Sequence, residues 1–251
     1  MTLVVPARAK LNLDLAVLAR MPDGFHEVRT QMQAVALHDL LELKTADRTA
    51  MTTSGRHPLD PNNNSVRVAH QALQDLVGRE LPTAFHLDKT IPPGSGMGGA
   101  SSDAAAALKG LVALHSIKAD LSKIAAAVGA DVAFFLTGGA ALAEGRGERL
   151  TVLGTKPEWY AIAWPDIELS TAAVYRAWDE VKGDGPNQLA AAAAHVEPRV
   201  GDFATSLGAG WQMTGSGSAF FLRCADQRSA EKAIAKVDGW TAVTHSVGPW
   251  A

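Results

Sequence analysis

The stretch IPPGSGMGGASSDAAAAL, residues 91–108, places four glycines directly before a run of alanines. Glycine lets the backbone turn in ways that other residues resist, whereas alanine is the strongest helix former. The stretch therefore predicts a loop that opens into a helix, which we expect to run from Ser101 to about Leu114. Such a junction can hold a phosphate, bind a dinucleotide, or form a tight turn without a ligand.

The dinucleotide interpretation rests on Gly94, Gly96 and Gly99, which satisfy the pattern G-x-G-x-x-G. That pattern belongs in the first strand–helix unit of its fold, with an acidic residue about twenty positions further on. Here several expected strands and a helix precede the loop, and Asp120 follows a helix instead of ending a strand. The match to the dinucleotide pattern is therefore accidental.

A phosphate loop of the type G-x-x-x-x-G-K-[ST] is also excluded, because no lysine precedes Ser101 and Ser102. Two alternatives remain for the glycine stretch. Either backbone N–H groups and the positive helix end form a phosphate seat, or the stretch is a plain turn in which the serines only cap the helix.

Local patterns divide the rest of the chain into strands and helices. Alternating or short apolar runs predict strands at 11–19, 27–35, 40–46, 84–91 and 159–165, a strand, turn and strand within 133–145, and a hairpin within 211–224. Capped, helically spaced segments predict helices that begin near 65, 121, 170 and 228. Because strands and helices do not alternate regularly, we expect an α+β fold in two lobes.

Composition limits the classes of partner. The formal charge is −3, from 23 basic and 26 acidic residues, and no basic stripe is visible, so we expect no nucleic-acid partner. Cys224 is the only cysteine, which excludes a disulfide framework. The apolar run 125–136 is broken by Asp131 and is too short to span a bilayer. We expect a cytoplasmic protein without a membrane partner.

Three motifs resemble those of one family. PPGSGMGGASSDAA (92–105) resembles the phosphate loop of the GHMP kinases, which include galactokinase, homoserine kinase and mevalonate kinase. PARAKLNLDL (6–15) resembles the family's N-terminal motif, and MTGSGSAFF (213–221) resembles its C-terminal glycine motif. Three further stretches, PDGFHEV, GADVAFF and AEGRGE, fit the same family. In combination, these motifs are most similar to those of the branch that phosphorylates a methylerythritol linked to cytidine diphosphate.

The resemblance implies a two-lobed GHMP kinase fold, with an ATP-binding lobe at 1–150 and a smaller substrate-binding lobe at 151–251. It implies ATP as phosphate donor, with Mg²⁺ carried by ATP and no metal site made by side chains. Asn63 matches a position that contacts adenine, although an Asn helix cap explains it nearly as well. The implied phosphate-binding residues are Pro92, Gly94, Ser95, Gly96, Met97, Gly98, Gly99, Ala100, Ser101 and Ser102.

Two residues carry the implied chemistry. From its position between a helix end and an expected apolar strand, Asp131 is as consistent with capping a turn as with facing a cleft. Lys10, at the edge of the first expected strand, would by default be solvated. The resemblance implies that Asp131 is the general base for the substrate hydroxyl and that Lys10 is the cation that pairs with it.

The implied substrate contacts come from both ends of the chain. Asn12 lies on the same strand face as Lys10. The resemblance implies that Phe25 and Tyr175 stack on the cytosine and that His26 hydrogen-bonds to it. The residue pattern alone also allows a simple β-turn at Phe25–His26 and a Tyr175 that packs in the core. Thr171 and Gly215 would lie near the reacting end.

The expected activity is ATP-dependent phosphorylation of the 2-hydroxyl of the cytidine-linked methylerythritol, by a monomer or weak homodimer. The alternatives are another GHMP kinase, acting on homoserine, mevalonate or a sugar, and a nucleotide-binding regulator without catalysis. The pair Phe25–His26 argues against the first, because those acceptors carry no base to stack.

Overall fold

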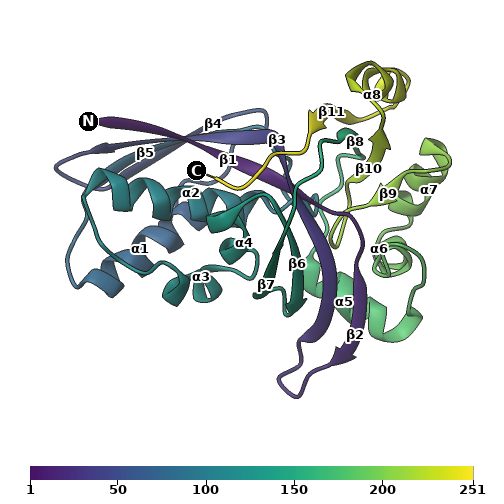
Figure 1. The fold of residues 1–251 in the computed structure, drawn as a ribbon, viewed down its shortest axis with the longest axis horizontal. Helices are drawn as coiled ribbons and strands as arrows, with labels where there is room; N and C mark the ends of the chain where they lie inside the picture. Colours follow the sequence, from purple (N-terminus) through teal and green to yellow (C-terminus); the bar gives the residue numbers. More distant parts are fainter. Residues whose placement is uncertain (251) are drawn as a thin grey trace. The chain divides into compact units, whose positions relative to one another are not determined.

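The computed structural model describes residues 1–250, in which 11 strands and 8 helices follow one another without regular alternation (Figure 1). The strands are β1 (Thr2–Asn12), β2 (Ala16–Arg20), β3 (His26–Thr45), β4 (Ala50–Gly55), β5 (Thr83–Lys89), β6 (Ala140–Gly145), β7 (Arg149–Leu153), β8 (Trp159–Trp164), β9 (Gln212–Met213), β10 (Phe220–Cys224) and β11 (Trp240–His245). The helices are α1 (Ser65–Val77), α2 (Gly99–Leu114), α3 (Ser122–Val128), α4 (Val132–Thr137), α5 (Thr171–Val181), α6 (Ala190–Val196), α7 (Pro198–Leu207) and α8 (Gln227–Ile234). This mixture confirms the predicted α+β class.

The chain divides into two compact units. The first unit contains Met1–Ala9, His38–Ile91 and Gly98–Thr137. The second contains Lys10–Leu37, Pro92–Met97 and the residues from 138 to 250. This grouping follows packing within each unit, and the expected lobe boundary between residues 150 and 151 stays a prediction.

In the first unit, helices α1–α4 lie on one side of the strands (Figure 1). Strand β5 pairs in parallel with β4 and antiparallel with the second half of β3. Its side chains alternate, so that Phe85 and Leu87 are buried beneath the helices. Helix α2 packs closely on β3, because a Cβ at Gly110 would lie 2.6 Å from the Leu43 side chain.

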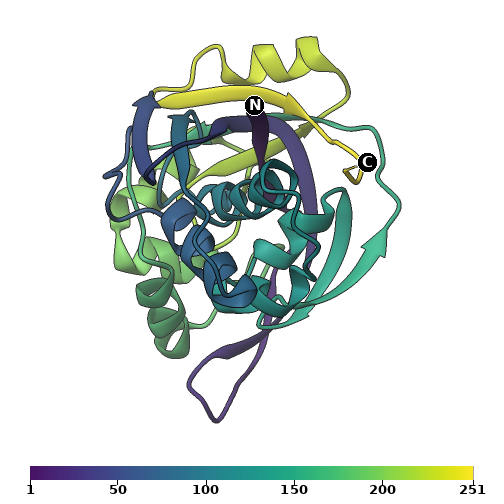
Figure 2. The same cartoon turned by 90° about the vertical axis from the view of Figure 1, so that its left-hand side faces the viewer.

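The second unit contains the first half of β3, which pairs with β2 and β6, and β6 pairs in turn with β7. A separate sheet has the strand order β11-β8-β10-β9. Helix α8 packs on this sheet beside β11 (Figure 2). Neighbouring residues of β10 face opposite sides, since Phe220 joins the core with α5–α7 and Phe221 contacts Tyr160.

Several expectations about secondary structure are wrong. The expected strand 11–19 is divided between β1 and β2, because the chain bends at Leu13–Leu15. The separate strands expected at 27–35 and 40–46 form the single strand β3, because the backbone stays extended between them. Residues 133–136 belong to helix α4 and not to a strand; a short apolar run does not distinguish the two. The helix expected near residue 228 is confirmed as α8, but the strand β11 that follows it and pairs with β8 was not expected.

Helix α1 begins at Ser65, as expected, and α3 ends at Val128 with Gly129 as its C-cap. Helix α2 begins at Gly99, two residues before its expected start, and ends at Leu114 as expected. The hairpin within 211–224 is confirmed as β9 and β10. The local signals for loops and caps therefore predict the elements that carry the glycine motifs.

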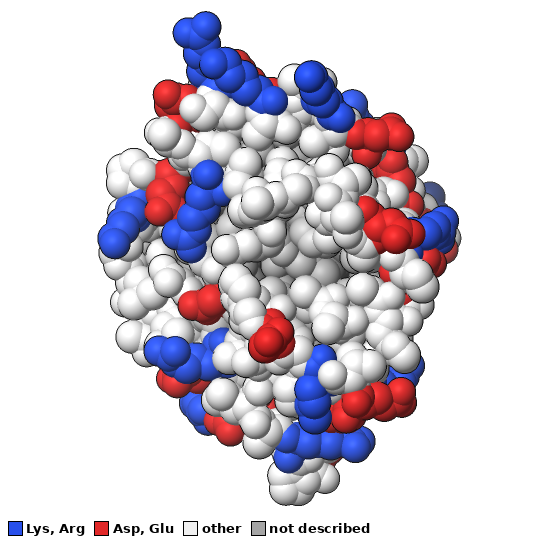
Figure 3. Space-filling view, turned by 90° about the vertical axis from the view of Figure 1, so that its right-hand side faces the viewer, with Lys and Arg blue, Asp and Glu red and all other residues white. Residues whose placement is uncertain are grey.

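On the face drawn in Figure 3, basic side chains lie beside acidic ones around an uncharged centre. This face therefore presents no single sign of charge. Among residues 1–250, no helix combines the length and the apolar character needed to cross a bilayer.

Candidate active site

The glycine loop reaches α2 through a series of left-handed backbone turns. Gly94, Gly96 and Gly98 have φ values of 59°, 78° and 75°. Side chains with a Cβ rarely adopt these conformations, so the sequence pattern and the backbone agree. The loop then continues directly into the first turn of α2, with Gly98 as its N-cap.

Carbonyl groups of this loop accept hydrogen bonds from other parts of the protein, whereas its N–H groups donate no backbone hydrogen bonds in the described part of the chain. Gly94 O accepts from Ser218 N–H at 3.2 Å, and Ser95 O accepts from Ala219 N–H at 3.0 Å. Within residues 1–250, no backbone hydrogen bond is donated by an N–H from Gly94 to Ser101. Unpaired N–H groups in positive-φ turns and at a helix N-terminus are the donors that proteins use for phosphate.

The first part of the loop packs against the C-terminal glycine motif of the same unit. A Cβ at Gly96 would collide with Thr214 O and would lie 3.0 Å from Gly217 N. The Ser95 hydroxyl is buried and donates to Pro92 O at 2.7 Å. Ser95 therefore has only its backbone N–H to offer a phosphate, and the two glycine motifs support each other.

Lys10 and Asn12 form a buried polar pair, and each is 4% exposed. The Lys10 ammonium donates to Asn12 Oδ1, as expected for residues that share a strand face. Asn12 N–H donates to Thr214 Oγ1 at 2.9 Å, and Asn12 Nδ2 donates to Thr30 Oγ1 at 2.8 Å. A Cβ at Gly215 would lie 3.1 Å from Lys10 Nζ, so Gly215 reaches the same place.

Two further side chains hold the C-terminal glycine motif. Thr171 Oγ1 lies 2.9 Å from Ser216 Oγ, which places Thr171 beside the motif, and its role near the reacting end stays a prediction. Asn187 was not expected, although it lies in the segment PNQLA. It is buried, and its amide donates to Met213 O at 2.7 Å and to Gly215 O at 2.9 Å. Because Asn187 lies in the polar segment KGDGPNQ (182–188), no local pattern marked it out.

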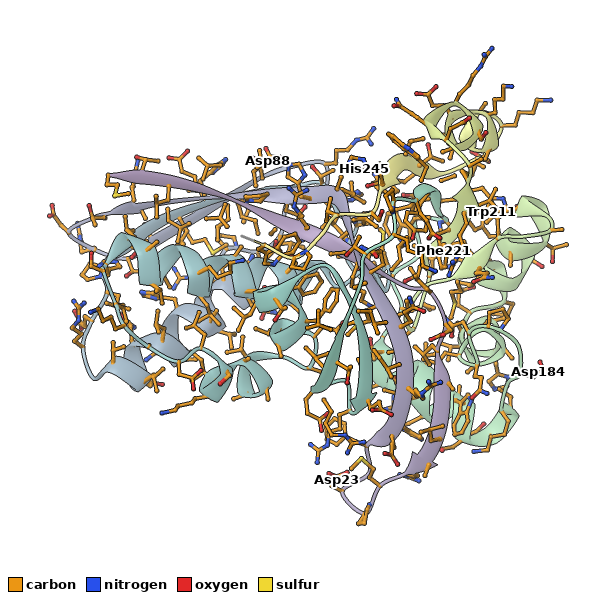
Figure 4. The ribbon with its side chains drawn as sticks, in the orientation of Figure 1. Asp23, Asp88, Asp184, Trp211, Phe221 and His245 are labelled. Atoms are coloured by element: carbon orange, nitrogen blue, oxygen red, sulfur yellow. The ribbon has the colours of Figure 1, made fainter. Side chains whose placement is uncertain are left out.

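Phe25 and His26 follow the turn between β2 and β3, where Figure 4 labels Asp23. Phe25 is 57% exposed, and the Arg146 guanidinium lies 4.5 Å from its ring centroid. Arg146 also pairs with Asp23. His26 is buried and stacks on Tyr175, with ring centroids 5.2 Å apart. Phe25 and Tyr175 therefore each have a protein partner, and their stacking on a base stays a prediction.

In the first unit, a buried ion cluster lies beneath the start of α2. Lys89 Nζ contacts Asp39 and lies 2.8 Å from Asp103 Oδ2. A Cβ at Gly99 would lie 2.8 Å from Lys89 Nζ, so the ammonium supports the first turn of the helix. Asp39 Oδ1 also accepts backbone N–H bonds from Thr90, at 2.6 Å, and from Ile91, at 2.7 Å. The sequence patterns did not indicate this cluster.

The cluster joins one cation to two carboxyl groups, and this arrangement shifts the pKa values of Lys89 and Asp103. Burial, to which the charge of Asp39 adds, raises the pKa of Asp103 to about 7 against the opposing effect of Lys89. Burial also disfavours the charged form of Lys89, but the charges of Asp103 and Asp39 outweigh it and raise the Lys89 pKa. Asp103 Oδ1 is buried without a hydrogen-bond partner among residues 1–250.

This shift predicts an effect of pH on stability. Since the pKa of Asp103 is raised from 3.8 to about 7, the folded protein keeps a proton that the unfolded chain loses. Stability therefore falls as the pH rises between these values. Asp103→Asn removes the effect, so the wild type should lose on the order of 2 kcal/mol more than the variant between pH 5 and pH 8.

Urea unfolding of both proteins at pH 5 and pH 8 measures this difference. Asp75→Asn, at an exposed position of α1, is the control and should follow the wild type at both pH values. An equal change in stability for the wild type and Asp103→Asn would contradict the assignment.

Asp131 lies in the turn between α3 and α4 and not before a strand. Its carbonyl oxygen accepts from Phe135 N–H at 3.2 Å, which begins the hydrogen bonding of α4. A Cβ at Gly129 would lie 3.3 Å from Ser101 Oγ. The turn that carries Asp131 therefore lies beside the first turn of α2, within the first unit.

The expected adenine contact lies before α1. Asn63 is exposed, and the cap of the helix is its neighbour Asn64, whose side chain accepts from Val66 N–H at 3.0 Å. The capping alternative therefore applies to Asn64, and the role of Asn63 stays a prediction. The described part of the chain holds no group of three or more His, Cys, Asp or Glu placed to bind a metal ion.

Comparison with known proteins gives a consistent result. The sequence profile described as "GHMP kinases N terminal domain" matches residues 64–139. The 4-diphosphocytidyl-2-C-methyl-D-erythritol kinase of Bacillus pumilus is 40% identical over 194 residues, which are 74% of this chain and 67% of that protein. The protein of the same name from Caldicellulosiruptor bescii is 38% identical over 208 residues, 80% of this chain and 73% of the relative.

Solved structures agree with the sequence relatives. A crystal structure of 4-(cytidine 5'-diphospho)-2C-methyl-D-erythritol kinase matches with a TM-score of 0.81 and 32% identity, over 98% of this chain and 100% of that chain. Homoserine kinase from Cytophaga hutchinsonii matches with a TM-score of 0.63 and 19% identity, over 99% of this chain and 95% of that chain, which is a likeness of fold alone. The predicted GHMP kinase fold is confirmed.

Proposed function

The chain belongs to the 4-diphosphocytidyl-2-C-methyl-D-erythritol kinase branch of the GHMP kinase family, and we propose that it transfers the γ-phosphate of ATP to the 2-hydroxyl of 4-diphosphocytidyl-2-C-methyl-D-erythritol. This reaction belongs to the non-mevalonate route of isoprenoid biosynthesis. The observation that carries the proposal is the set of unpaired backbone N–H groups from Gly94 to Ser101, at the start of α2.

These N–H groups suit the phosphates of ATP. They are held by a loop in which the carbonyl groups of Gly94, Ser95 and Met97 already accept backbone hydrogen bonds, so they need little reorganisation when an anion arrives. The proposed contacts include the Ser101 and Ser102 hydroxyls and, for adenine, Asn63. Mg²⁺ would be held mainly by the phosphates of ATP, as is usual where proteins provide no cage of carboxylates.

The proposed chemistry needs a proton acceptor and a positive charge. We assign Asp131 as the general base that takes the proton of the 2-hydroxyl, and Lys10 as the cation that stabilises charge on the transferring group. In support, Asp131 lies beside the first turn of α2 in its own unit. Lys10 is buried and held by Asn12 next to Gly215 in the other unit.

The remaining assignments concern the acceptor. Asn12, Thr171 and Gly215 would bind the methylerythritol, because they meet at the C-terminal glycine motif. Phe25, His26 and Tyr175 would bind the cytosine. Both substrates are small, water-soluble phosphate esters, which suits a cytoplasmic reaction. We expect a monomer or weak homodimer, and analytical ultracentrifugation measures this oligomeric state.

The experiment that tests the proposal is ADP release from Mg²⁺-ATP with three acceptors in parallel. Turnover is expected with 4-diphosphocytidyl-2-C-methyl-D-erythritol and not with homoserine or mevalonate. Turnover with homoserine or mevalonate alone would support the kinase activity but would show that the proposed acceptor is wrong. ATP binding without turnover on any acceptor would contradict the proposed activity and favour a nucleotide-binding regulator.

A further inference from the structure

The His26 ring is held on three sides by residues of α5. Tyr175 stacks on it at 5.2 Å between centroids, and Trp178 meets its edge at 5.6 Å. Asp179 Oδ1 lies 2.8 Å from His26 Nε2. The three helix residues are spaced i, i+3 and i+4 and therefore share one face of α5. The His26 side chain is only 5% exposed, so its ring has one orientation.

The Asp179 carboxyl group is ionised at neutral pH. Its hydrogen bond with His26 is the largest of the effects that lower its pKa, and the nearby charge of Arg20 acts in the same direction. Arg20 Nη1 lies 3.6 Å from Asp179 Oδ2, and Lys182 Nζ lies 3.9 Å from Oδ1. An ionised carboxylate can only accept hydrogen bonds, so the proton of the shared bond belongs to His26 Nε2.

We propose that Asp179 is a positioning residue that fixes His26 in the Nε2–H tautomer, so that its Nδ1 accepts a hydrogen bond from the exocyclic amine of a cytosine. Within residues 1–250, no hydrogen bond reaches His26 Nδ1. In a neutral imidazole with a proton on Nε2, Nδ1 carries a lone pair. This inference rests on the proposed cytidine-linked substrate.

The tautomer decides which pyrimidine fits. Cytosine presents an amine at position 4, which donates, whereas the corresponding oxygen of a uracil accepts. An accepting Nδ1 therefore pairs with cytosine and opposes the oxygen of uracil. The stacking aromatic residues bind either base equally. The preference for cytosine over uracil therefore depends on the proton that Asp179 holds on His26 Nε2.

Asp179→Asn tests this directly, because an amide can donate to Nε2 and move the imidazole proton to Nδ1. In a protease triad, the same exchange leaves the geometry intact and produces the wrong tautomer. Asp179→Glu keeps the acceptor and is the rescue variant. Asp184→Asn, at the exposed position labelled in Figure 4, is the matched control in the same unit.

Two measurements are made at pH 8.5, where an ordinary imidazole is neutral. The first is the ¹⁵N spectrum of His26, which distinguishes the two tautomers. The second is the affinity for CDP and UDP, with a non-hydrolysable ATP analogue in excess to fill the nucleotide loop. Neither depends on turnover, so both remain informative if the proposed kinase activity fails.

The wild type, Asp179→Glu and Asp184→Asn should show the Nε2–H tautomer and bind CDP about 10- to 100-fold more tightly than UDP. Asp179→Asn should show the Nδ1–H tautomer and lose or reverse this preference. A wild-type spectrum of the Nδ1–H form would overturn the proposal. So would an Asp179→Asn variant that weakens CDP and UDP by the same factor, since that result indicates a purely structural role.

Discussion

Replacing Asp131 by asparagine is expected to lower kcat about 10²- to 10⁴-fold, which is the range that a positioned general base contributes. Asparagine keeps the size of the side chain but cannot take up a proton. ATP affinity should change little, because the proposed phosphate seat consists of backbone N–H groups on the loop and α2. Steady-state kinetics and ATP titration measure the two effects separately.

The position of Asp131 supports a selective loss. It is only partly buried, in a turn beside the first turn of α2, and the hydrogen bond that begins α4 uses its backbone carbonyl. The substitution should therefore leave the fold intact, which a melting curve checks. Asp120→Asn, at an exposed turn before α3, is the matched control and should keep the wild-type rate. A near-normal kcat in Asp131→Asn would remove the general-base assignment.

Local chemistry explains why the glycine loop and α2 could be predicted from the sequence. Gly94, Gly96 and Gly98 need positive φ, and the alanines that follow form a helix almost anywhere. The pairing of Lys10 with Asn12 follows from the strand period of two. Each of these features depends on residues within a few positions of one another.

Features that join distant segments were not predictable in this way. The contact of Asn187 with the C-terminal glycine motif links residues from 26 to 28 positions apart, and that of Asp179 with His26 links residues 153 positions apart. A single sequence carries no signal for such pairs beyond a polar residue on an apolar helix face, as for Asp179 on α5. The α4 error has another cause, because a short apolar run carries no period.

The buried cluster beneath α2 gives the largest expected effect on stability. Lys89→Met should destabilise the protein by about 3 to 5 kcal/mol, because it leaves two buried carboxyl groups, Asp39 and Asp103, without their cation. For a chain of this size the loss corresponds to a fall in Tm of roughly 10 °C. Urea unfolding at pH 8 measures the free energy, and a thermal melt measures the Tm.

The physical cause can be separated from the loss of packing. Asp39 keeps its backbone donors at Thr90 and Ile91, so Asp103 is the carboxyl group left with the fewest partners. Asp103→Asn in the Lys89→Met background should therefore recover part of the lost stability, although each substitution alone removes a contact. Lys44→Met, at an exposed position of β3, is the control for the apolar side chain and should change stability by less than about 0.5 kcal/mol. Additive losses in the double variant would instead mean that the Lys89 stem, and not its charge, supports α2.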